Sequence, residues 1–173
     1  KSFYLGAYKW YLDSTKLKSW SWKSPTVSKT HPNFCTYSKA NWSGYQLEWF
    51  YQRMYINALY MMKYWNPNCQ ATVGWGNNDY NRLSNTGWTN SQTSATYWTS
   101  SDYNQIKLFW LEDWRGNISE ALWGMYLTAN NYVYTQLTWW NWMATWWKST
   151  GISHSATQWE IYWIWWANKS MFI

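Results

Sequence analysis

The strongest periodic pattern in the chain lies over residues 43–64, where apolar side chains recur at steps of three and four residues. This spacing is typical of an amphipathic helix. Ser43 and Gln46 have the spacing of a capping box, and Asn66-Pro67 would end the helix. We therefore predict a helix over 43–64 with its apolar stripe in the core. The stripe comprises Leu47, Phe50, Tyr51, Met54, Tyr55, Ala58, Leu59 and Met62. The polar residues Glu48, Gln52, Arg53 and Asn57 fall mostly on the opposite face.

Shorter apolar runs predict β structure on both sides of this helix. Residues 1–13 are expected to form a strand, a turn and a second strand, and residues 34–39 a strand or a single helical turn. The polar residues 14–32, which include two prolines, are predicted to be a long surface connection. Further strands are expected at 70–76, 105–111, 132–134, 159–166 and 171–173.

Two long stretches contain few aliphatic residues and are predicted to be irregular. Residues 77–101 are mainly Asn, Ser, Thr, Tyr and Gly, and residues 139–151 are rich in Trp. Long ordered loops inside compact domains are usually functional. Mixed short strands with one strong helix predict an α+β fold with long loops.

Residues 108–126, LFWLEDWRGNISEALWGMY, predict a strand that enters a tight turn and leaves as another strand. Gly116 can supply a positive φ, and Asn117 tolerates the left-handed region and can bond its own backbone. Glu120 is framed by apolar neighbours and would need hydrogen-bond or charge partners if it is buried.

This run resembles the signature G-[LI]-x-D-x-x-G-N-[VI]-x-E-[WF] of C-type-lectin-like domains related to formylglycine-generating enzymes. The resemblance is closer to tail and fibre proteins of phages, some of them diversified by retroelements. Gly116, Asn117, Ile118 and Glu120 match, whereas Ser119 and Ala121 stand where the pattern usually has aromatic residues. Other segments resemble parts of these domains in the same order: FYLGAYK, SWSWKSPTVSKT, SGYQ and NPNCQATVGWG.

The resemblance implies one C-type-lectin-like domain over residues 1–173, expected to be the C-terminal part of a longer chain. That fold has an irregular, twisted antiparallel sheet, one or two helices and long loops. Gly116, Asn117 and Glu120 would then be structural residues of its turn. A phage relative would be located in the virion, on the tail or surface, or on a cell surface if the protein is phage-derived.

Tryptophan is unusually frequent, with 21 residues against 8 glycines. Ordinary proteins contain about 7% glycine and far less tryptophan. Trp22, Trp42, Trp65 and Trp110 stand where glycine would make local sense, and Trp110 occupies a glycine position of the signature. Two explanations stay open: an aromatic binding surface, or UGA codons that the source organism reads as glycine.

The charge and the cysteines limit which partners and sites are expected. The net charge of +6 comes largely from lysines in the first 30 residues, which suit a solvated face or an anionic partner chain. Nucleic acid is not an expected partner. Cys35 and Cys69 belong to no CxxC or Cys/His metal pattern, and a disulfide between them is possible but not implied. No apolar run approaches the roughly 18 residues of a membrane span, so membrane insertion is not expected.

No catalytic or metal-binding constellation is predicted. His31 and His154 have no carboxylate close in sequence, and the cysteines lie too early to match the pair used for formylglycine generation. Asn66-Pro67-Asn68 and Asn77-Asn78-Asp79 only faintly resemble a lectin calcium site, which needs several carboxylates. We expect no enzyme activity, no metal and no cofactor.

The remaining signal is a surface rich in Tyr, Trp, Asn and Ser, the composition of antibody-like binding loops. The predicted ligand-binding residues are Asn77, Asn78, Tyr80, Asn81, Tyr97, Tyr103, Trp139, Trp140, Trp142 and Trp146. The first hypothesis is a receptor-binding domain of a phage or phage-derived tail fibre or variable protein, with a host surface protein or glycan as partner. The alternative is a structural virion decoration or assembly domain of the same fold. In either case other fibre subunits are expected partners, and the domain could form a homotrimer.

Overall fold

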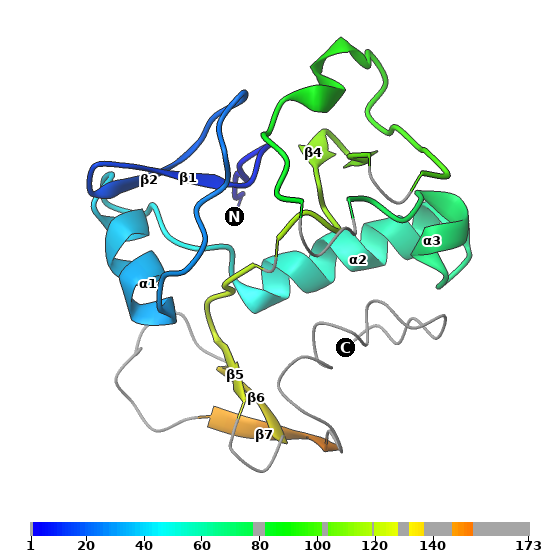
Figure 1. The fold of residues 1–173 in the computed structure, drawn as a ribbon. Helices are drawn as coiled ribbons and strands as arrows, with labels where there is room; N and C mark the ends of the chain where they lie inside the picture. Colours follow the sequence, from blue (N-terminus) through cyan, green and yellow to red (C-terminus); the bar gives the residue numbers. More distant parts are fainter. Residues whose placement is uncertain are drawn as a thin grey trace. The chain divides into compact units, whose positions relative to one another are not determined.

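The computed structural model describes residues 2–77, 82–101, 104–118, 120–127, 132–136 and 147–153 (Figure 1). The chain groups into two compact units. Unit 1 combines Lys1–Leu47 with Asn68–Ala121, and unit 2 combines Glu48–Pro67 with Leu122–Ile173. Helices and short antiparallel sheets occur in the described part, so the general class is α+β, as predicted.

Unit 1 begins with an antiparallel hairpin of β1 (Trp10–Asp13) and β2 (Lys16–Ser19), in which Leu12 faces Leu17 across the pair. The two-residue turn contains Ser14 at φ +57°, a left-handed backbone that suits the twist of such hairpins. Only β1 lies inside the predicted residues 1–13. The prediction of a surface connection from residue 14 was wrong for β2, because a strand with one buried apolar side chain, Leu17, looks polar in sequence.

Helix α1 (His31–Lys39) follows, where the sequence left a strand or a single turn open. The Thr30 side chain caps its N-terminus by accepting a hydrogen bond from the Asn33 amide, and Pro32 lies in the first turn. Residues 70–76 were predicted as a strand, but helix α3 (Cys69–Thr72) occupies their start. Asn68 caps α3 by accepting from the amides of Gln70 and Ala71, which favours a helical turn there.

The rest of unit 1 is the irregular segment 82–101 and the hairpin of β3 (Lys107–Leu108) and β4 (Leu111–Glu112). The segment contains one 3₁₀ turn, η1 (Trp88–Ser91), and isolated bridges join Gly74 to Thr99 and Tyr97 to Lys107. Both the loop and the β structure near 105–111 agree with the sequence prediction. The buried apolar side chains of unit 1 are Leu17, Leu47, Cys69, Val73, Ile106, Leu108 and Trp114.

Helix α2 (Phe50–Tyr64) is the main helix of unit 2. It ends as predicted, with Trp65 in the left-handed region before Asn66-Pro67. Its start was predicted seven residues too early. The Gln52 side chain accepts a hydrogen bond from the Trp49 amide at 2.7 Å, so the helix begins after Trp49 and not at Ser43.

The buried face of α2 is not the predicted one. The most buried residues of α2 are Phe50, Gln52, Arg53, Ile56, Asn57 and Tyr60, while Tyr55 is 54% and Met62 is 69% exposed. The predicted stripe is therefore right for Phe50 and wrong for Tyr55 and Met62. The prediction that Gln52, Arg53 and Asn57 point away from the core was also wrong. An ion pair of 2.6 Å between Arg53 and Glu48 neutralises the charge on the buried face.

Unit 2 also contains a three-stranded antiparallel sheet of β5 (Met125–Leu127), β6 (Tyr132–Gln136) and β7 (Trp147–Ser153). The predicted strand at 132–134 is thereby confirmed. The prediction of an irregular stretch over 139–151 was wrong from Trp147 onwards, since β7 pairs with β6. The strands predicted at 159–166 and 171–173 lie outside the described residues.

Candidate functional site

The candidate site is centred on the turn that follows β4, residues 113–118 of unit 1. Three of its residues have left-handed backbone: Asp113 at φ +53°, Gly116 at +85° and Asn117 at +65°. A Cβ at Gly116 would lie 2.9 Å from both the N and the O of Asn77, so the two backbones approach too closely for any side chain. The turn thus packs its backbone directly against the start of the 77–101 loop.

Glu112 connects the turn to the middle of that loop. Its side chain is buried, and one carboxylate oxygen accepts from the Gly87 amide at 2.5 Å. The other oxygen accepts from the Thr89 amide at 2.8 Å and from the Thr89 hydroxyl at 2.6 Å. Three donors on one buried carboxylate fix the position of the η1 turn relative to β4.

Asn117 fixes the beginning of the loop in the same way. Its side-chain oxygen accepts from the Ser84 amide at 3.0 Å, and its amide group donates to the Ser84 carbonyl at 3.0 Å. The Asn117 backbone amide donates to the Asn77 carbonyl at 2.6 Å. The two asparagines and Glu112 therefore hold the loop at several points along its length.

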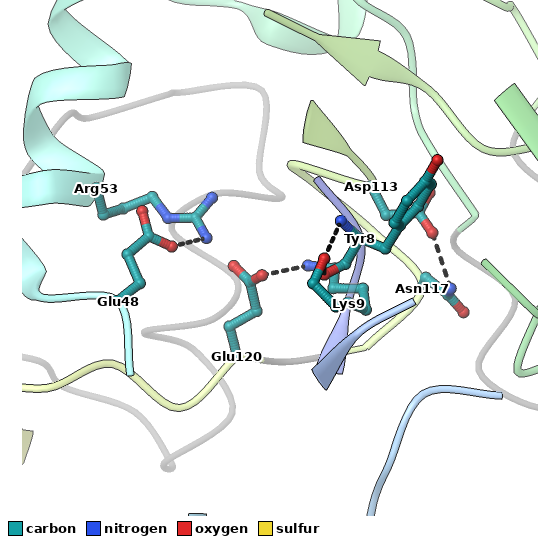
Figure 2. Close-up of polar contacts among 8 residues, drawn as sticks. Tyr8, Lys9, Glu48, Arg53, Asp113, Asn117 and Glu120 are labelled. Carbon is teal, nitrogen blue, oxygen red and sulfur yellow. Dashed lines mark hydrogen bonds and ion pairs between the residues drawn. The ribbon is translucent and has the colours of Figure 1, made fainter. Parts of the chain in front are cut away.

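Figure 2 shows the Lys9–Glu120 pair and the carboxyl group of Asp113, the first residue of the turn. Lys9, only 3% exposed, forms an ion pair of 2.9 Å with Glu120. Asp113 is fully buried and accepts from the Asn117 side chain at 2.8 Å. Burial raises the pKa of Asp113 to about 7, although the nearby Lys9 ammonium opposes the rise.

The charged groups of this cluster are buried or paired with one another. A catalytic acid or base must come within hydrogen-bond distance of its substrate, and Lys9 and Asp113 are closed off from solvent. Glu120 is partly exposed, but its carboxylate is engaged by Lys9. The ion pair connects the N-terminal segment to the residues that follow the turn, which is a structural role.

The two cysteines are free thiols in the structure. On α1, Cys35 Sγ lies 3.6 Å from His31 Nδ1, a pairing that the sequence analysis missed although the two residues have i, i+4 spacing. Burial raises the pKa of Cys35 to about 11, so the thiol is not activated as a nucleophile. Burial also raises the pKa of Cys69, whose sulfur accepts from Arg115 Nη1 at 3.1 Å.

Two of the ten predicted ligand-binding residues are described. Asn77 is buried, and its amide group donates to the Arg82 carbonyl and the Ser84 hydroxyl, so this side chain belongs to the framework of the loop. Tyr97 is half-buried, and its backbone pairs with Lys107. The others lie outside the described residues: Asn78, Tyr80, Asn81, Tyr103, Trp139, Trp140, Trp142 and Trp146.

The loop presents other polar side chains that the sequence analysis did not single out. Asn85, Asn90, Ser91, Thr93 and Ser94 are exposed on the segment that Glu112 holds. Lys9 was also missed as a partner of Glu120. A lone lysine between Tyr8 and Trp10 was the one available signal, because such a charge inside an aromatic run needs a partner once it is buried.

In the described part of the chain, no group of three or more His, Cys, Asp or Glu residues is placed to hold a metal ion. Among the same residues, no helix is both long and apolar enough to cross a membrane. Comparisons with protein-family models, with curated proteins and with solved structures found no match.

Proposed function

We propose that this protein is a non-catalytic binding module with a C-type-lectin-like fold, the receptor-binding domain of a phage or phage-derived tail fibre or variable protein. The proposal rests on the resemblance of residues 108–126 to the turn signature of these domains. It is also supported by the α+β class and by the close packing around Gly116 and Asn117.

The observation that carries the proposal is the way the 82–101 loop is held. Its backbone is bonded at Gly87 and Thr89 by the buried Glu112 of β4, and at Ser84 by the half-buried Asn117 of the turn. Its exposed positions carry small polar residues such as Asn90 and Ser94. A fixed backbone lowers the entropy lost on binding, and Asn and Ser provide adaptable hydrogen bonds.

The expected ligand is a protein or glycan of a host surface. Tyrosine gives a large contact area at low entropy cost, so we assign the main contacts to Tyr80 and Tyr103, which flank the described part of the loop. Their neighbours Asn78 and Asn81 would supply hydrogen bonds.

The test is a binding screen of the purified protein against intact host cells and a glycan array. We expect Tyr80→Ala and Tyr103→Ala to lose binding by about tenfold or more each, the effect of one lost contact of 1–2 kcal/mol. Tyr4→Ala is the matched control, because Tyr4 is 94% exposed and lies outside the loop. Circular dichroism and thermal melting should show that all three variants stay folded.

Two results would count against the proposal. If Tyr80→Ala and Tyr103→Ala bind as well as Tyr4→Ala, the loop is not the binding surface. If no host surface is bound while the protein assembles as a trimer, the structural virion domain becomes the better explanation.

A further inference from the structure

Three tryptophans in the described part of the chain have a backbone conformation that favours glycine. Trp22 has φ +61°, Trp65 has φ +51° and Trp110 has φ +69°. In L-amino acids the left-handed region brings Cβ close to the backbone, so bulky residues rarely occupy it and glycine does so freely.

Each of the three also lies at a place in the chain where glycine is the usual residue. Trp65 is the left-handed residue that ends α2, and its amide still donates to the Met61 carbonyl at 2.9 Å. Trp110 is the second residue of the two-residue turn between β3 and β4, where Phe109 and Trp110 both have positive φ. Turns of that kind strongly prefer glycine at the second position.

Trp22 lies in the turn after β2, where its amide donates to the Thr86 carbonyl at 2.8 Å. The next residue, Lys23, is bonded to Thr86 as well, because its carbonyl accepts a hydrogen bond from the Thr86 amide at 2.9 Å. The backbone at residue 22 is thus fixed by its bonds to residue 86, and it has to adopt the left-handed conformation whatever side chain it carries.

The indole rings gain little in return for this conformation. The exposed fractions of Trp22, Trp65 and Trp110 are 61%, 86% and 57%. Within the described part of the chain, only Trp110 has a cation–π contact among the three, with Nζ of the buried Lys107 at 5.2 Å from its ring centroid. Neither burial nor backbone preference therefore selects tryptophan at these positions.

The other tryptophans in the described part of the chain do not have this left-handed backbone. Trp114 is only 6% exposed and has no left-handed backbone. Trp42, the fourth position where the sequence alone favoured glycine, is exposed but is not left-handed. The conformational requirement thus separates one group of tryptophans from the rest.

We infer that residues 22, 65 and 110 are glycine in the protein as its source organism makes it, because their codons are UGA and that organism decodes UGA as glycine. A single decoding rule would account for all three positions. It would leave tryptophans encoded by UGG, such as Trp114, unchanged. It also accounts for part of the excess of tryptophan over glycine.

The first test is the coding DNA together with peptide mass spectrometry of the protein isolated from its source. We expect UGA at codons 22, 65 and 110 and UGG at codon 114. The peptides that contain the three positions should each be lighter by the mass difference between a tryptophan and a glycine residue. UGG codons, or tryptophan masses, at the three positions would overturn the inference.

The second test asks whether the fold prefers glycine there. Trp22→Gly, Trp65→Gly and Trp110→Gly should each raise the Tm by roughly 2–4 °C, the effect of removing one left-handed non-glycine residue. Trp98→Gly is the matched control, because Trp98 is 54% exposed without a left-handed backbone and should gain nothing. Trp114→Gly should lower the Tm strongly. If the Tm of the three variants rises no more than that of Trp98→Gly, these positions do not require glycine.

Discussion

The turn after β4 and helix α2 both bury polar side chains, but they do so in different ways. At the end of β4, next to the turn, Glu112 is buried with three hydrogen-bond donors on its carboxylate. In α2, Asn57 is equally buried, and within the described part of the chain neither atom of its amide group has a hydrogen-bond partner. A buried polar group contributes to stability only when it is paired, so Glu112 should stabilise the fold and Asn57 should not.

The largest effect is expected for Glu112→Ala. The substitution leaves the amides of Gly87 and Thr89 and the Thr89 hydroxyl without their acceptor, so we expect a loss of about 3–5 kcal/mol in the free energy of unfolding. Urea denaturation measures it, and hydrogen exchange at Gly87 and Thr89 should become faster. Asp13→Ala is the control, because the exposed Asp13–Lys18 pair should contribute less than about 1 kcal/mol. Equal losses for the two variants would contradict the anchoring role of Glu112.

The corrected face of α2 is tested by Ile56→Ala and Met62→Ala. Ile56 is 7% exposed, and removal of its side chain should cost about 2–4 kcal/mol through lost burial and a residual cavity. Met62 is 69% exposed, and its removal should change stability by less than about 0.5 kcal/mol. Thermal and urea unfolding of the two variants shows which face of α2 is buried. A larger loss at Met62 than at Ile56 would restore the face predicted from the sequence.

A smaller effect is expected where the turn meets the loop. Gly116→Ala places a Cβ 2.9 Å from the Asn77 backbone and forces a non-glycine residue to φ +85°, so it should cost about 2 kcal/mol. Gly44→Ala is a matched control, since Gly44 has φ +87° and no atom within 4 Å of its Cβ position. The difference between the two losses in urea unfolding isolates the cost of the close approach. Equal losses would mean that only the backbone angle matters at Gly116.

A further effect concerns the pH dependence of stability. Since burial raises the pKa of Asp113 to about 7, the folded protein keeps a proton that the unfolded chain loses near its ordinary value of 3.8. Stability should therefore fall as the pH rises through the window between these values. Asp113→Asn carries no charge and keeps an oxygen for Asn117, so it should flatten this fall. Unfolding curves at about pH 5 and about pH 8 test this, and an unchanged slope in Asp113→Asn would contradict it.

The sequence predicted those features that depend on local chemistry. Asn66-Pro67 ended α2 where expected, because proline cannot continue a helix. The polar composition of residues 82–101 correctly indicated a loop. The start of α2 could not be read from Ser43 and Gln46, because Gln52 and Trp49 offer a competing cap with the same spacing.

The buried polar residues could not be predicted in the same way. Arg53 and Lys9 are tolerated inside because Glu48 and Glu120 neutralise them, and the second of these pairs joins distant parts of the chain. Hydrophobic periodicity counts each residue by its own polarity and therefore assigns such side chains to the surface. The anchoring role of Glu112 was hidden for the same reason, since its donors lie more than twenty residues earlier.

The bonds of the N-terminal segment determine when this protein can fold during its synthesis. The Ala7 carbonyl accepts from the Glu112 amide at 2.8 Å, and Lys9 pairs with Glu120, so both contacts join residues more than a hundred positions apart. At a translation rate of roughly 5–20 residues per second, the ribosome needs roughly 5–20 s to make the second partner after the first. During that interval Lys9 lacks its native partner Glu120, and the aromatic residues beside it are open to water or to a chaperone. Residues 7 and 9 thus reach their final positions well after they are synthesised.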